Sequence, residues 1–519
     1  MENSQFLVAE FSLGCLALFL LIKLAIVIWW KPRQITNHFK AQGITGPPHK
    51  LLFGNSIEYG KLMNAETSKP MKLSHNIVPR VQPHYHYWSK IYGPNFLMWF
   101  GPSPMLFVGS WELGKQVLGD KLGNFGKPLS NQLLKDVLGD GLPVLNGEKW
   151  AHHRRIINPS FHIDKLKGMV SSMAESIGNM LEVWEKVVKS SCENEVDVSE
   201  EFNVLSSDII ARTAFGSNYL QGKHIFDVLA KVTSMTCKDT AKLIVPGYRY
   251  LPLKGNRDRW RMHREIKNSL KQLILNREKT GTNTNDLLGS MMNTVRELRN
   301  SENNAGLTTD EIIEECKTFF VTGQETTRNF MTYAIFLLAM HPEWQERART
   351  EVLQVCGNCH PTFESQSKLK IVGMILNEVM RLYPTAVSVL REAHKDIILG
   401  DLSILAGTQI VFPLLALNHD IALWGEDASE FKPERFSQGL ANAAKDDSAL
   451  FIPFGYGLRI CVGQNFAMLE AKIAISMILQ RFSFVLSPAY VHAPTSFITL
   501  YPQHGVQIIL QDLHTTADD

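Results

Sequence analysis

Residues 454–463 place a single thiol, Cys461, in a glycine-rich loop that also carries a cation. Gly455 and Gly457 can adopt a positive φ, and neither puts a side chain between the backbone and a flat cofactor. A helix predicted directly after the loop would point free N–H groups and its positive dipole end at the sulfur. We therefore expect Cys461 to be a thiolate, the form of cysteine that binds metals. The alternative is a small buried cysteine without chemistry.

Glu325 and Thr326 place an acid next to an alcohol within residues 322–327. This segment contains one glycine and three threonines, which weaken a helix and offer hydroxyls as alternative hydrogen-bond partners. We expect a local opening of the helix there, with room for small molecules beside a cofactor. Glu325 and Thr326 could then relay protons. The alternative is a surface stretch of poor helix formers without chemistry.

Periodicity and capping signals predict the elements that position these residues. Thr308 and Glu311 form a capping box for a long helix that ends near Met340, and Pro342 then starts the next helix. Apolar residues three and four apart predict further helices at 164–184, 198–215 and 259–278. Shorter β-like runs lie at 96–100, 105–108, 397–399, 410–412 and 497–510. The chain is therefore predicted to be mainly α with a minor β region.

The composition of the 519-residue chain narrows its possible functions. A hydrophobic content of 45% allows a large core, and no linker rich in Gly, Ser or Pro lies between residue 60 and the C-terminus. The net charge of +2 disfavours a nucleic-acid partner. Seven cysteines without a regular framework indicate a reducing compartment. We expect one large domain after the N-terminal region.

Residues 11–30 are apolar apart from Lys23 and are long enough to span a bilayer. Two glutamates precede this run, and three basic residues follow it, so the positive-inside rule predicts a lumenal N-terminus and a cytosolic remainder. A buried core helix is the alternative. We divide the chain into a transmembrane anchor at 1–32, a Pro/Gly hinge at 33–60 and a catalytic domain at 61–519.

The pattern Phe454-x-x-Gly457-x-Arg459-x-Cys461-x-Gly463 resembles the haem-binding signature of the cytochrome P-450 family of haem-thiolate monooxygenases. The resemblance implies the cytochrome P-450 fold, with a single large haem domain behind an N-terminal membrane anchor. It implies haem b (iron-protoporphyrin IX) as the cofactor and Cys461 as the metal ligand. Phe454 and Arg459 are then cofactor-binding residues, one covering the sulfur and one neutralising an acidic group.

Further family motifs occur in the expected order over nearly the whole chain. Trp150 and Arg154 match a Trp-x-x-x-Arg helix in which both residues reach a haem propionate, and Arg391 matches another propionate-binding position. Glu325 and Thr326 match the catalytic acid–alcohol pair that delivers protons. Three residues match a structural motif that holds the haem core: Glu378, Arg381 and Arg435.

Thr322 departs from the family pattern, which usually has alanine or glycine at this position, next to where oxygen binds. Its extra bulk and hydroxyl suggest altered regiochemistry or altered chemistry. By family position, the substrate pocket draws on residues 133–145, 318–322, 385–389 and 497–498.

The resemblance implies hydroxylation or oxidation of a lipophilic substrate with O2 and electrons from NADPH. A separate NADPH-cytochrome P-450 reductase would deliver these electrons, because the chain has no dinucleotide fingerprint of its own. The protein would act as a monomer in the endoplasmic reticulum membrane, as a single-pass protein with its catalytic domain facing the cytosol. Two alternatives stay open: a haem-thiolate isomerase or dehydratase without net electron uptake, and a non-catalytic haem sensor.

Residues 74–80, 314–320 and 463–467 resemble one plant clan within the family. That clan contains secologanin synthase, cytokinin hydroxylase and enzymes that inactivate brassinosteroids and gibberellins. The resemblance therefore implies a terpenoid-derived or hormone-like plant metabolite as the substrate.

Overall fold

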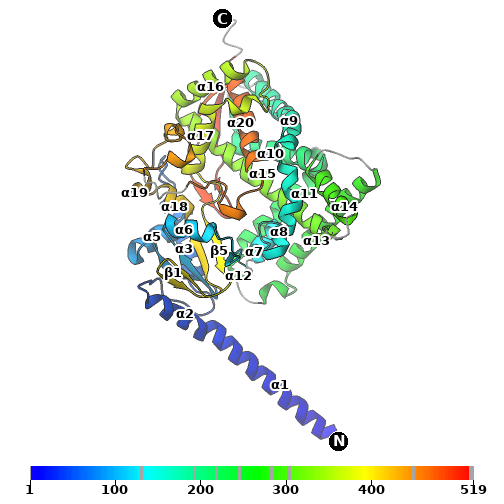
Figure 1. Cartoon of the computed structure of the whole chain (residues 1–519), viewed down its shortest axis with the longest axis vertical. Coiled ribbons are helices and arrows are strands. Elements are labelled where there is room, and N and C mark those ends of the chain that lie inside the picture. The colour runs from blue at the N-terminus through cyan, green and yellow to red at the C-terminus, as the bar shows by residue number, and fades with distance from the viewer. Residues whose placement is uncertain are drawn as a thin grey trace.

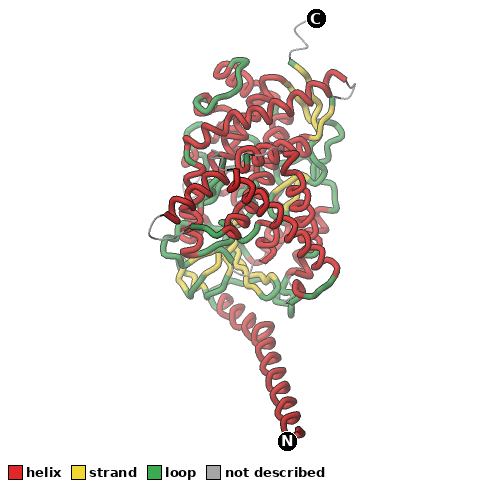
Figure 2. Tube along the Cα trace, turned by 90° about the vertical axis from the view of Figure 1, so that its right-hand side faces the viewer, coloured by secondary structure: helices red, strands yellow, loops and turns green. Residues whose placement is uncertain are grey.

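The computed structural model describes residues 2–128, 132–190, 194–216, 219–243, 247–280, 286–300, 306–445 and 451–513. Helices form most of the globule, and strands lie both near the end from which helix α1 (Glu2–Ala25) projects and near the opposite end (Figures 1 and 2). The further α-helices in the described residues are α2 (Lys31–Lys40), α3 (Ser56–Thr67), α4 (Val78–Val81), α5 (Pro83–Tyr92), α6 (Trp111–Leu118), α7 (Gln132–Leu138), α8 (Gly147–Ile157), α9 (Ile163–Ser190), α10 (Val198–Phe215), α11 (Tyr219–Lys238), α12 (Thr240–Leu243), α13 (Lys254–Thr280), α14 (Leu287–Asn300), α15 (Thr309–Met340), α16 (Pro342–Cys356), α17 (Lys370–Leu382), α18 (Leu414–Asn418), α19 (Ile421–Trp424) and α20 (Gln464–Arg481).

The strands form several small sheets. The largest has the order β1-β2-β8-β5-β3, in which β2 and β8 run parallel and the other neighbours run antiparallel. A second sheet has the order β4-β12-β9, and the pairs β6-β7 and β10-β11 are antiparallel. The strand bounds are β1 (Phe96–Phe100), β2 (Ser103–Phe107), β3 (Phe125–Gly126), β4 (Glu195–Asp197), β5 (Val389–Ala393), β6 (Ile397–Leu399), β7 (Leu402–Ile404), β8 (Gln409–Phe412), β9 (Phe482–Leu486), β10 (Pro494–Ser496), β11 (Leu500–Pro502) and β12 (Gln507–Asp512).

The predicted mainly α class with a minor β region is confirmed, and so is the start of α15. The Thr308 side chain accepts a hydrogen bond from the Glu311 N–H, and the Glu311 carboxylate accepts one from the Thr308 N–H, which completes the capping box. The prediction of one strand over 497–510 is wrong. Gly505 turns the chain between β11 and β12 with φ of 72°, so the run forms two strands in different sheets.

Helix α15 lies at the centre of the main hydrophobic core. Nearly all of its residues before 321 and after 326 are buried, and it packs against α10, α17 and α20. A second core cluster lies between the five-stranded sheet and neighbouring helices. Because α20 follows the Cys461 loop directly, the contact between α15 and α20 holds the two predicted reactive segments in one rigid unit.

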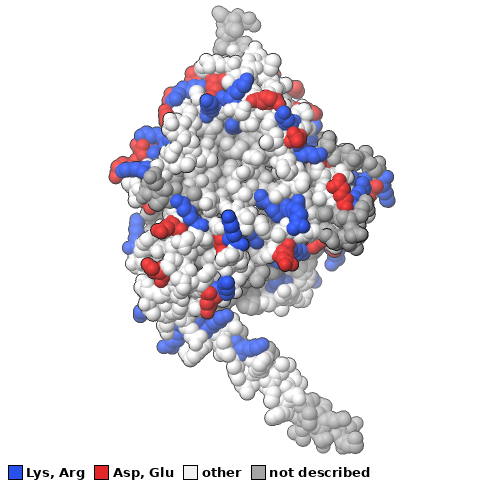
Figure 3. Space-filling model, viewed as in Figure 1, with Lys and Arg blue, Asp and Glu red and all other residues white. Residues whose placement is uncertain are grey.

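The N-terminal helix leaves the globule at its sheet end (Figures 1 and 2). The continuous helix Phe11–Lys40 is long and apolar enough to cross a membrane, and none of its apolar window is buried inside the protein. A buried core helix is therefore not what this segment forms. Figure 3 shows basic side chains where the apolar helix meets the globule. Lys31, Arg33 and Lys40 belong to α2, which follows the apolar run.

Residues 33–60, predicted as a hinge, lie against the five-stranded sheet. Ile35 and Phe39 of α2 are buried in the same cluster as strand residues, and the Leu97 N–H donates to the Thr45 carbonyl at 3.0 Å. A side chain at Gly46 would collide with the backbone of Leu97. The division into anchor, hinge and catalytic domain stays a prediction, but these contacts make α2 a part of the globule.

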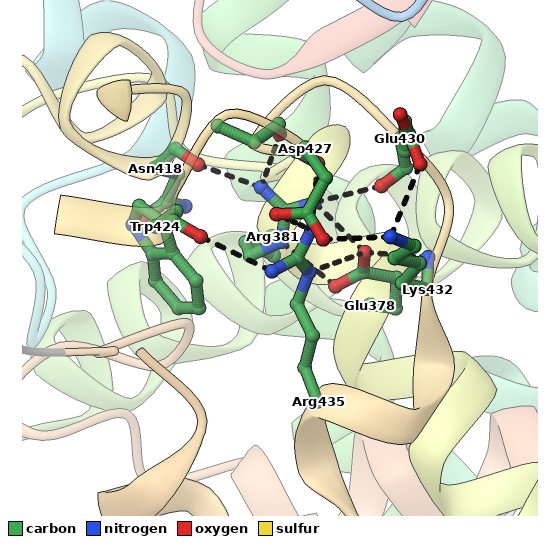
Figure 4. Close-up of polar contacts among 9 residues, drawn as sticks. Glu378, Arg381, Asn418, Trp424, Asp427, Glu430, Lys432 and Arg435 are labelled. Carbon is green, nitrogen blue, oxygen red and sulfur yellow. Dashed lines mark hydrogen bonds and ion pairs between the residues drawn. The ribbon is translucent and has the colours of Figure 1, made fainter. Parts of the chain in front are cut away.

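Glu378 and Arg381 form a fully buried ion pair on α17. The Arg381 guanidinium donates to both carboxylate oxygens of Glu378, at 2.7 and 2.8 Å. It also donates to three backbone carbonyls of the segment that follows β8, those of Asn418, Ala428 and Glu430, at 2.8, 2.7 and 3.1 Å (Figure 4). Every guanidinium nitrogen is thus satisfied, the condition under which a buried charge is tolerated.

Arg435 joins the same network from the other side, as the sequence motif predicts. Its guanidinium lies 3.6 Å from Glu378 and 2.7 Å from the Asp427 carboxylate, and it donates to the carbonyls of Trp424 and Asp427 (Figure 4). Hydrogen bonds from Lys432 and Arg435 lower the pKa of Asp427 to about 2, although burial acts in the opposite direction. The network fixes the 418–435 segment against α17 and so supports the chain that leads to the Cys461 loop.

Replacing Arg381 by lysine tests this support. One ammonium group cannot replace the paired bonds to Glu378 and the three bonds to carbonyls, so buried acceptors lose their partners. We expect a loss of stability of about 3–5 kcal/mol and little folded protein. Thermal unfolding and the yield of soluble protein measure this. Arg347→Lys is the matched control, because its partner Glu434 is exposed and the pair contributes little; equal stability of the two variants would contradict the assignment.

Candidate active site

The Cys461 loop has the backbone geometry that its glycines predict. Gly455 and Gly457 have φ of 83° and 69°, and a side chain at Gly457 would collide with the Leu118 carbonyl. The Cys461 N–H donates to the Phe454 carbonyl at 2.8 Å, which closes the loop. Helix α20 starts three residues after Cys461, so its N-terminal turn lies next to the sulfur as expected.

The sulfur faces a space inside the protein. Cys461 is solvent-accessible, yet enough protein surrounds its thiol that burial raises its pKa. The Gly463 N–H and the Arg154 charge act in the opposite direction without reversing the shift. The expectation that the polypeptide alone favours the thiolate is therefore wrong. A bound metal ion would have to supply the deprotonation, as coordinating cations do for thiols.

The middle of α15 is more accessible than the rest of the helix. Residues 321–326 are only half-buried, although this helix is buried on both sides of them. The predicted opening of the helix is wrong, because α15 continues without a break. The hydroxyls of Thr322, Thr326 and Thr327 donate to the carbonyls four residues earlier, at 2.8, 2.6 and 2.5 Å, and so stay within the helical ladder.

Glu325 and Thr326 both lie in this accessible stretch, but their side chains have different partners. Thr326 Oγ1 donates to the Thr322 carbonyl, whereas Glu325 Oε1 accepts a hydrogen bond from Thr499 at 2.8 Å. The structure describes no direct hydrogen bond between the acid and the alcohol. The catalytic role of the pair stays a prediction.

Three of the predicted cofactor-binding residues lie together. The Arg459 guanidinium lies 4.0 Å from the centre of the Trp150 ring and donates to the Leu145 carbonyl at 2.7 Å. Arg154 donates to the Ile460 carbonyl at 2.7 Å, directly beside Cys461. Helix α8, which carries Trp150 and Arg154, is therefore tied to the Cys461 loop from both of these positions.

A buried pair holds α8 against α15. His153 Nδ1 lies 2.6 Å from Glu315 Oε1, and both side chains are almost fully buried. The other Glu315 oxygen accepts a hydrogen bond from the Leu142 N–H at 3.2 Å. The sequence suggests no chemistry for His153, and the structure gives it this positioning contact.

Arg391 on β5 faces the same group of cations. It is buried, and burial lowers its pKa to about 10. The pKa of Arg459 also falls to about 10, first through burial and then through repulsion by Arg391 and Arg154. Arg391 and Arg154 therefore lie close enough to destabilise the charge of Arg459.

Lys127 is a fourth cation at this site, which the sequence motifs do not predict. Burial, followed by repulsion from Arg391 and Arg459, lowers its pKa to about 7. Its backbone N–H donates to Asn146 Oδ1 at 2.7 Å, and Asn146 also accepts from Arg459 at 3.1 Å. Within the described part of the chain, no carboxylate forms an ion pair with Lys127, Arg154, Arg391 or Arg459.

Four cations without a carboxylate partner define a site for a buried polyanion. The accessible Cys461 thiol belongs to the same site, because Arg154 donates to the carbonyl of the preceding residue, Ile460. A flat cofactor with two carboxylates and a thiolate-bound metal fits this arrangement. Haem meets those requirements: Cys461 would hold its iron, and the cations with Trp150 would hold its propionates.

Comparisons with known proteins agree with this class. The cytochrome P450 family model matches residues 72–505. Cytochrome P450 734A6 of Oryza sativa subsp. japonica is 44% identical over 507 residues, which cover 94% of this chain and 93% of that protein. Cytochrome P450 734A1 of Arabidopsis thaliana is 42% identical over 528 residues, covering 100% of this chain and 99% of that protein. Cytochrome P450 72A15 of Arabidopsis thaliana is 42% identical over 493 residues, covering 94% and 95%.

The fold and the site thus define a haem-thiolate protein, and the sequence comparisons specify the family. The chain belongs to the cytochrome P450 family, whose members are monooxygenases that use haem and NADPH-derived electrons received through a reductase. The resemblance that the Cys461 motif indicates is therefore confirmed. The individual roles of Trp150, Arg154, Arg391, Phe454 and Arg459 toward haem stay predictions.

Glu470 on α20 is a second residue that the sequence motifs do not indicate. It is 1% exposed, and burial raises its pKa to about 8. Within the described residues, its Oε1 atom has no hydrogen-bond partner. The carboxyl group is thus neutral at pH 7 and lies under the central stretch of α15.

Lys127→Met tests the cation site. Removing one of the four charges weakens the hold on the cofactor carboxylates, so we expect haem to be lost to an acceptor protein about ten times faster, as for one charge-assisted hydrogen bond. The rate of haem transfer measured by absorbance tests this. Lys121→Met is the control, because Lys121 is exposed in the same segment. Equal transfer rates for the two variants would contradict the assignment.

Glu470→Gln tests the neutral buried carboxyl. Between the ordinary pKa of 4.5 and the raised pKa of about 8, the folded state holds a proton that the unfolded state has released. This group therefore lowers stability as the pH rises, by about 1.4 kcal/mol per unit within that window. In the natural protein we expect the unfolding temperature to fall between pH 5 and pH 8. In Glu470→Gln we expect it to fall less. The exposed Glu426→Gln should keep the full decrease, and an unchanged profile in Glu470→Gln would contradict the assignment.

Proposed function

We propose that this protein is a membrane-anchored monooxygenase that hydroxylates a lipophilic, terpenoid-derived or hormone-like plant metabolite. The observation that carries the proposal is the accessible Cys461 thiol, which lies at a site of four cations without a carboxylate partner in the described part of the chain and directly before α20, the helix that packs against α15. The plant clan resemblance of residues 74–80, 314–320 and 463–467 supports the substrate class. Bound haem supplies the activation of O2 and the oxidation of the substrate.

The role of the polypeptide in this reaction is to position the substrate and to move protons. Glu325 carries a carboxyl group that can exchange protons, in the accessible part of α15. One residue away, the Thr326 hydroxyl oxygen can accept a hydrogen bond, since its own proton is donated to the Thr322 carbonyl. The Thr322 hydroxyl is already bonded to the Thr318 carbonyl, so Thr322 adds bulk at this point and no free donor. This favours an effect on substrate approach and regiochemistry.

The segments assigned to the substrate pocket contact one another in the fold, which supports their joint role. Thr318 Oγ1 of α15 donates to the Leu138 carbonyl at 2.7 Å, joining segments 318–322 and 133–145. The Leu500 N–H donates to the Thr385 carbonyl at 2.9 Å, joining segment 385–389 to the turn that carries residues 497–498. A pocket drawn from these segments would combine apolar side chains with hydroxyl groups, which suits a lipophilic substrate.

We place the protein in the endoplasmic reticulum membrane as a single-pass monomer, with its catalytic domain in the cytosol. The apolar helix Phe11–Lys40 and the basic residues after residue 30 support this orientation. Electrons would come from NADPH-cytochrome P-450 reductase in the same membrane. The cytosolic side is where a soluble NADPH pool reaches that partner.

Reconstitution of the full chain with haem, purified reductase and a panel of steroid and terpenoid substrates tests the proposal. We expect NADPH consumption with an oxygenated product, identified as a mass increase of one oxygen atom. Product without NADPH consumption would support an isomerase or dehydratase, and binding without product would support a sensor. Cys461→Ser is the inactive control. We expect it to lose both turnover and the thiolate type of reduced carbon monoxide spectrum, and retention of either would contradict the proposal.

A further inference from the structure

A buried threonine links the C-terminal hairpin to α15 at Glu325. Thr499 lies in the turn between β10 and β11 and is 5% exposed. Its hydroxyl donates to Glu325 Oε1 at 2.8 Å and accepts from Asn329 Nδ2 at 3.0 Å. Glu325 and Asn329 are four residues apart, so they lie one turn apart on one face of α15. Both hydrogen-bonding capacities of the hydroxyl are therefore used on this face.

The hairpin turn is itself held in place. The Phe497 N–H donates to the Thr499 carbonyl at 3.3 Å, and β10 pairs with β11 on either side of the turn. The Leu500 N–H donates to the Thr385 carbonyl at 2.9 Å, which fixes the turn to the segment after α17. The Asn329 amide is 1% exposed, and no other hydrogen bond of its Nδ2 group is described. The Thr499 hydroxyl is thus placed by rigid elements on two sides.

A glutamate side chain has three rotatable bonds, and its carboxyl group needs a partner to stay in one orientation. Glu325 lies in the half-buried part of α15, where a carboxyl group without a fixed donor can turn toward solvent. The structure describes a hydrogen bond from the Thr499 hydroxyl to the Glu325 carboxyl group, and among the described contacts of this carboxyl group its donor is the one that lies outside α15. A displacement of about 1 Å at a proton donor is enough to impair transfer strongly.

We propose that Thr499 is a positioning residue for proton delivery, and that its hydroxyl, held by Asn329, keeps the Glu325 carboxyl group in its working orientation. The inference rests on the proposed role of Glu325. It assigns no contact with the reacting atoms to Thr499 or to Asn329. Their effect acts through Glu325 alone.

The consequence for turnover follows from the balance of protons and electrons. In productive turnover, substrate C–H, O2, NADPH and one proton give the alcohol, water and NADP+. When protons arrive at the wrong place, O2, NADPH and one proton give hydrogen peroxide and NADP+, and the substrate is unchanged. Loss of positioning therefore raises the ratio of peroxide to product without weakening substrate binding.

The test compares Thr499→Val with Thr499→Ser in the haem-loaded full chain with reductase. Valine has the same shape without the hydroxyl, and we expect the ratio of peroxide to product to rise about ten-fold. This is less than the roughly 10²–10⁴-fold contribution of an acid–base group itself, because Thr499 acts only on the orientation of Glu325. Serine keeps the hydroxyl and should restore most of the coupling. Thr408→Val is the matched control, because Thr408 is fully buried and its hydroxyl has no described partner. It should leave the ratio unchanged.

Two further measurements separate positioning from a packing effect. Crystal structures of the variants should show the Glu325 carboxyl group displaced in Thr499→Val and in place in Thr499→Ser. The substrate dissociation constant, measured by spectral titration, should be equal in all three proteins. Glu325→Gln combined with Thr499→Val should be no worse than Glu325→Gln alone, because both substitutions remove the same function.

The outcomes distinguish this inference from the proposed function. If Glu325→Gln leaves coupling unchanged, the role proposed for Glu325 fails, and the inference fails with it. If Glu325→Gln uncouples turnover but Thr499→Val does not, the positioning inference alone is overturned. A weaker substrate affinity in Thr499→Val with normal coupling would make Thr499 a pocket residue and would also overturn it.

Discussion

Lys127, Arg154, Arg391 and Arg459 repel one another inside the protein unless an anion lies among them. They come from the segment after β3, from α8, from β5 and from the Cys461 loop, so their approach requires all four parts of the chain to be held in place. Burial lowers the pKa of all four, and repulsion among the cations adds to the shifts of Lys127 and Arg459. Cofactor carboxylates would offset this repulsion and join the same four parts.

The other buried charges serve this arrangement. The Glu378–Arg381–Arg435 network has every guanidinium nitrogen of Arg381 satisfied, and it fixes the segment that precedes the Cys461 loop. The His153–Glu315 pair holds α8 against α15 and so fixes the position of Trp150 and Arg154, which lie on α8. Both pairs are buried, and the hydrogen bonds of the Glu378–Arg381 pair give it directional specificity more than net stability.

The sequence predicts the structural features that depend on residues close together along the chain. The capping box of α15, the positive φ of Gly455 and Gly457 and the pairing of Glu378 with Arg381 are local or motif-encoded features, and the structure contains them. The predicted opening of α15 was wrong because threonine hydroxyls can also donate back to their own helix. The thiolate expectation was wrong because burial outweighs one N–H and one guanidinium.

The sequence contains no comparable motif for residues that reach the site through contacts between distant parts of the chain. Lys127 lies in a short segment between β3 and α7 without a motif, and Thr499 is 174 positions from Glu325. In the sequence, Glu470 is a polar residue in a largely apolar helix. Its burial follows only from the packing of α10 and α15 around it. Each of these contacts depends on tertiary structure, which spacing alone does not specify.

The proposed function requires a bond between the sulfur of Cys461 and the iron of haem. X-ray absorption at the iron edge of the purified haem-loaded protein measures this ligand directly. One sulfur atom bound to iron in the natural chain, and none in Cys461→Ser, is the predicted result. Iron bound only by nitrogen and oxygen in the natural chain would contradict the central claim.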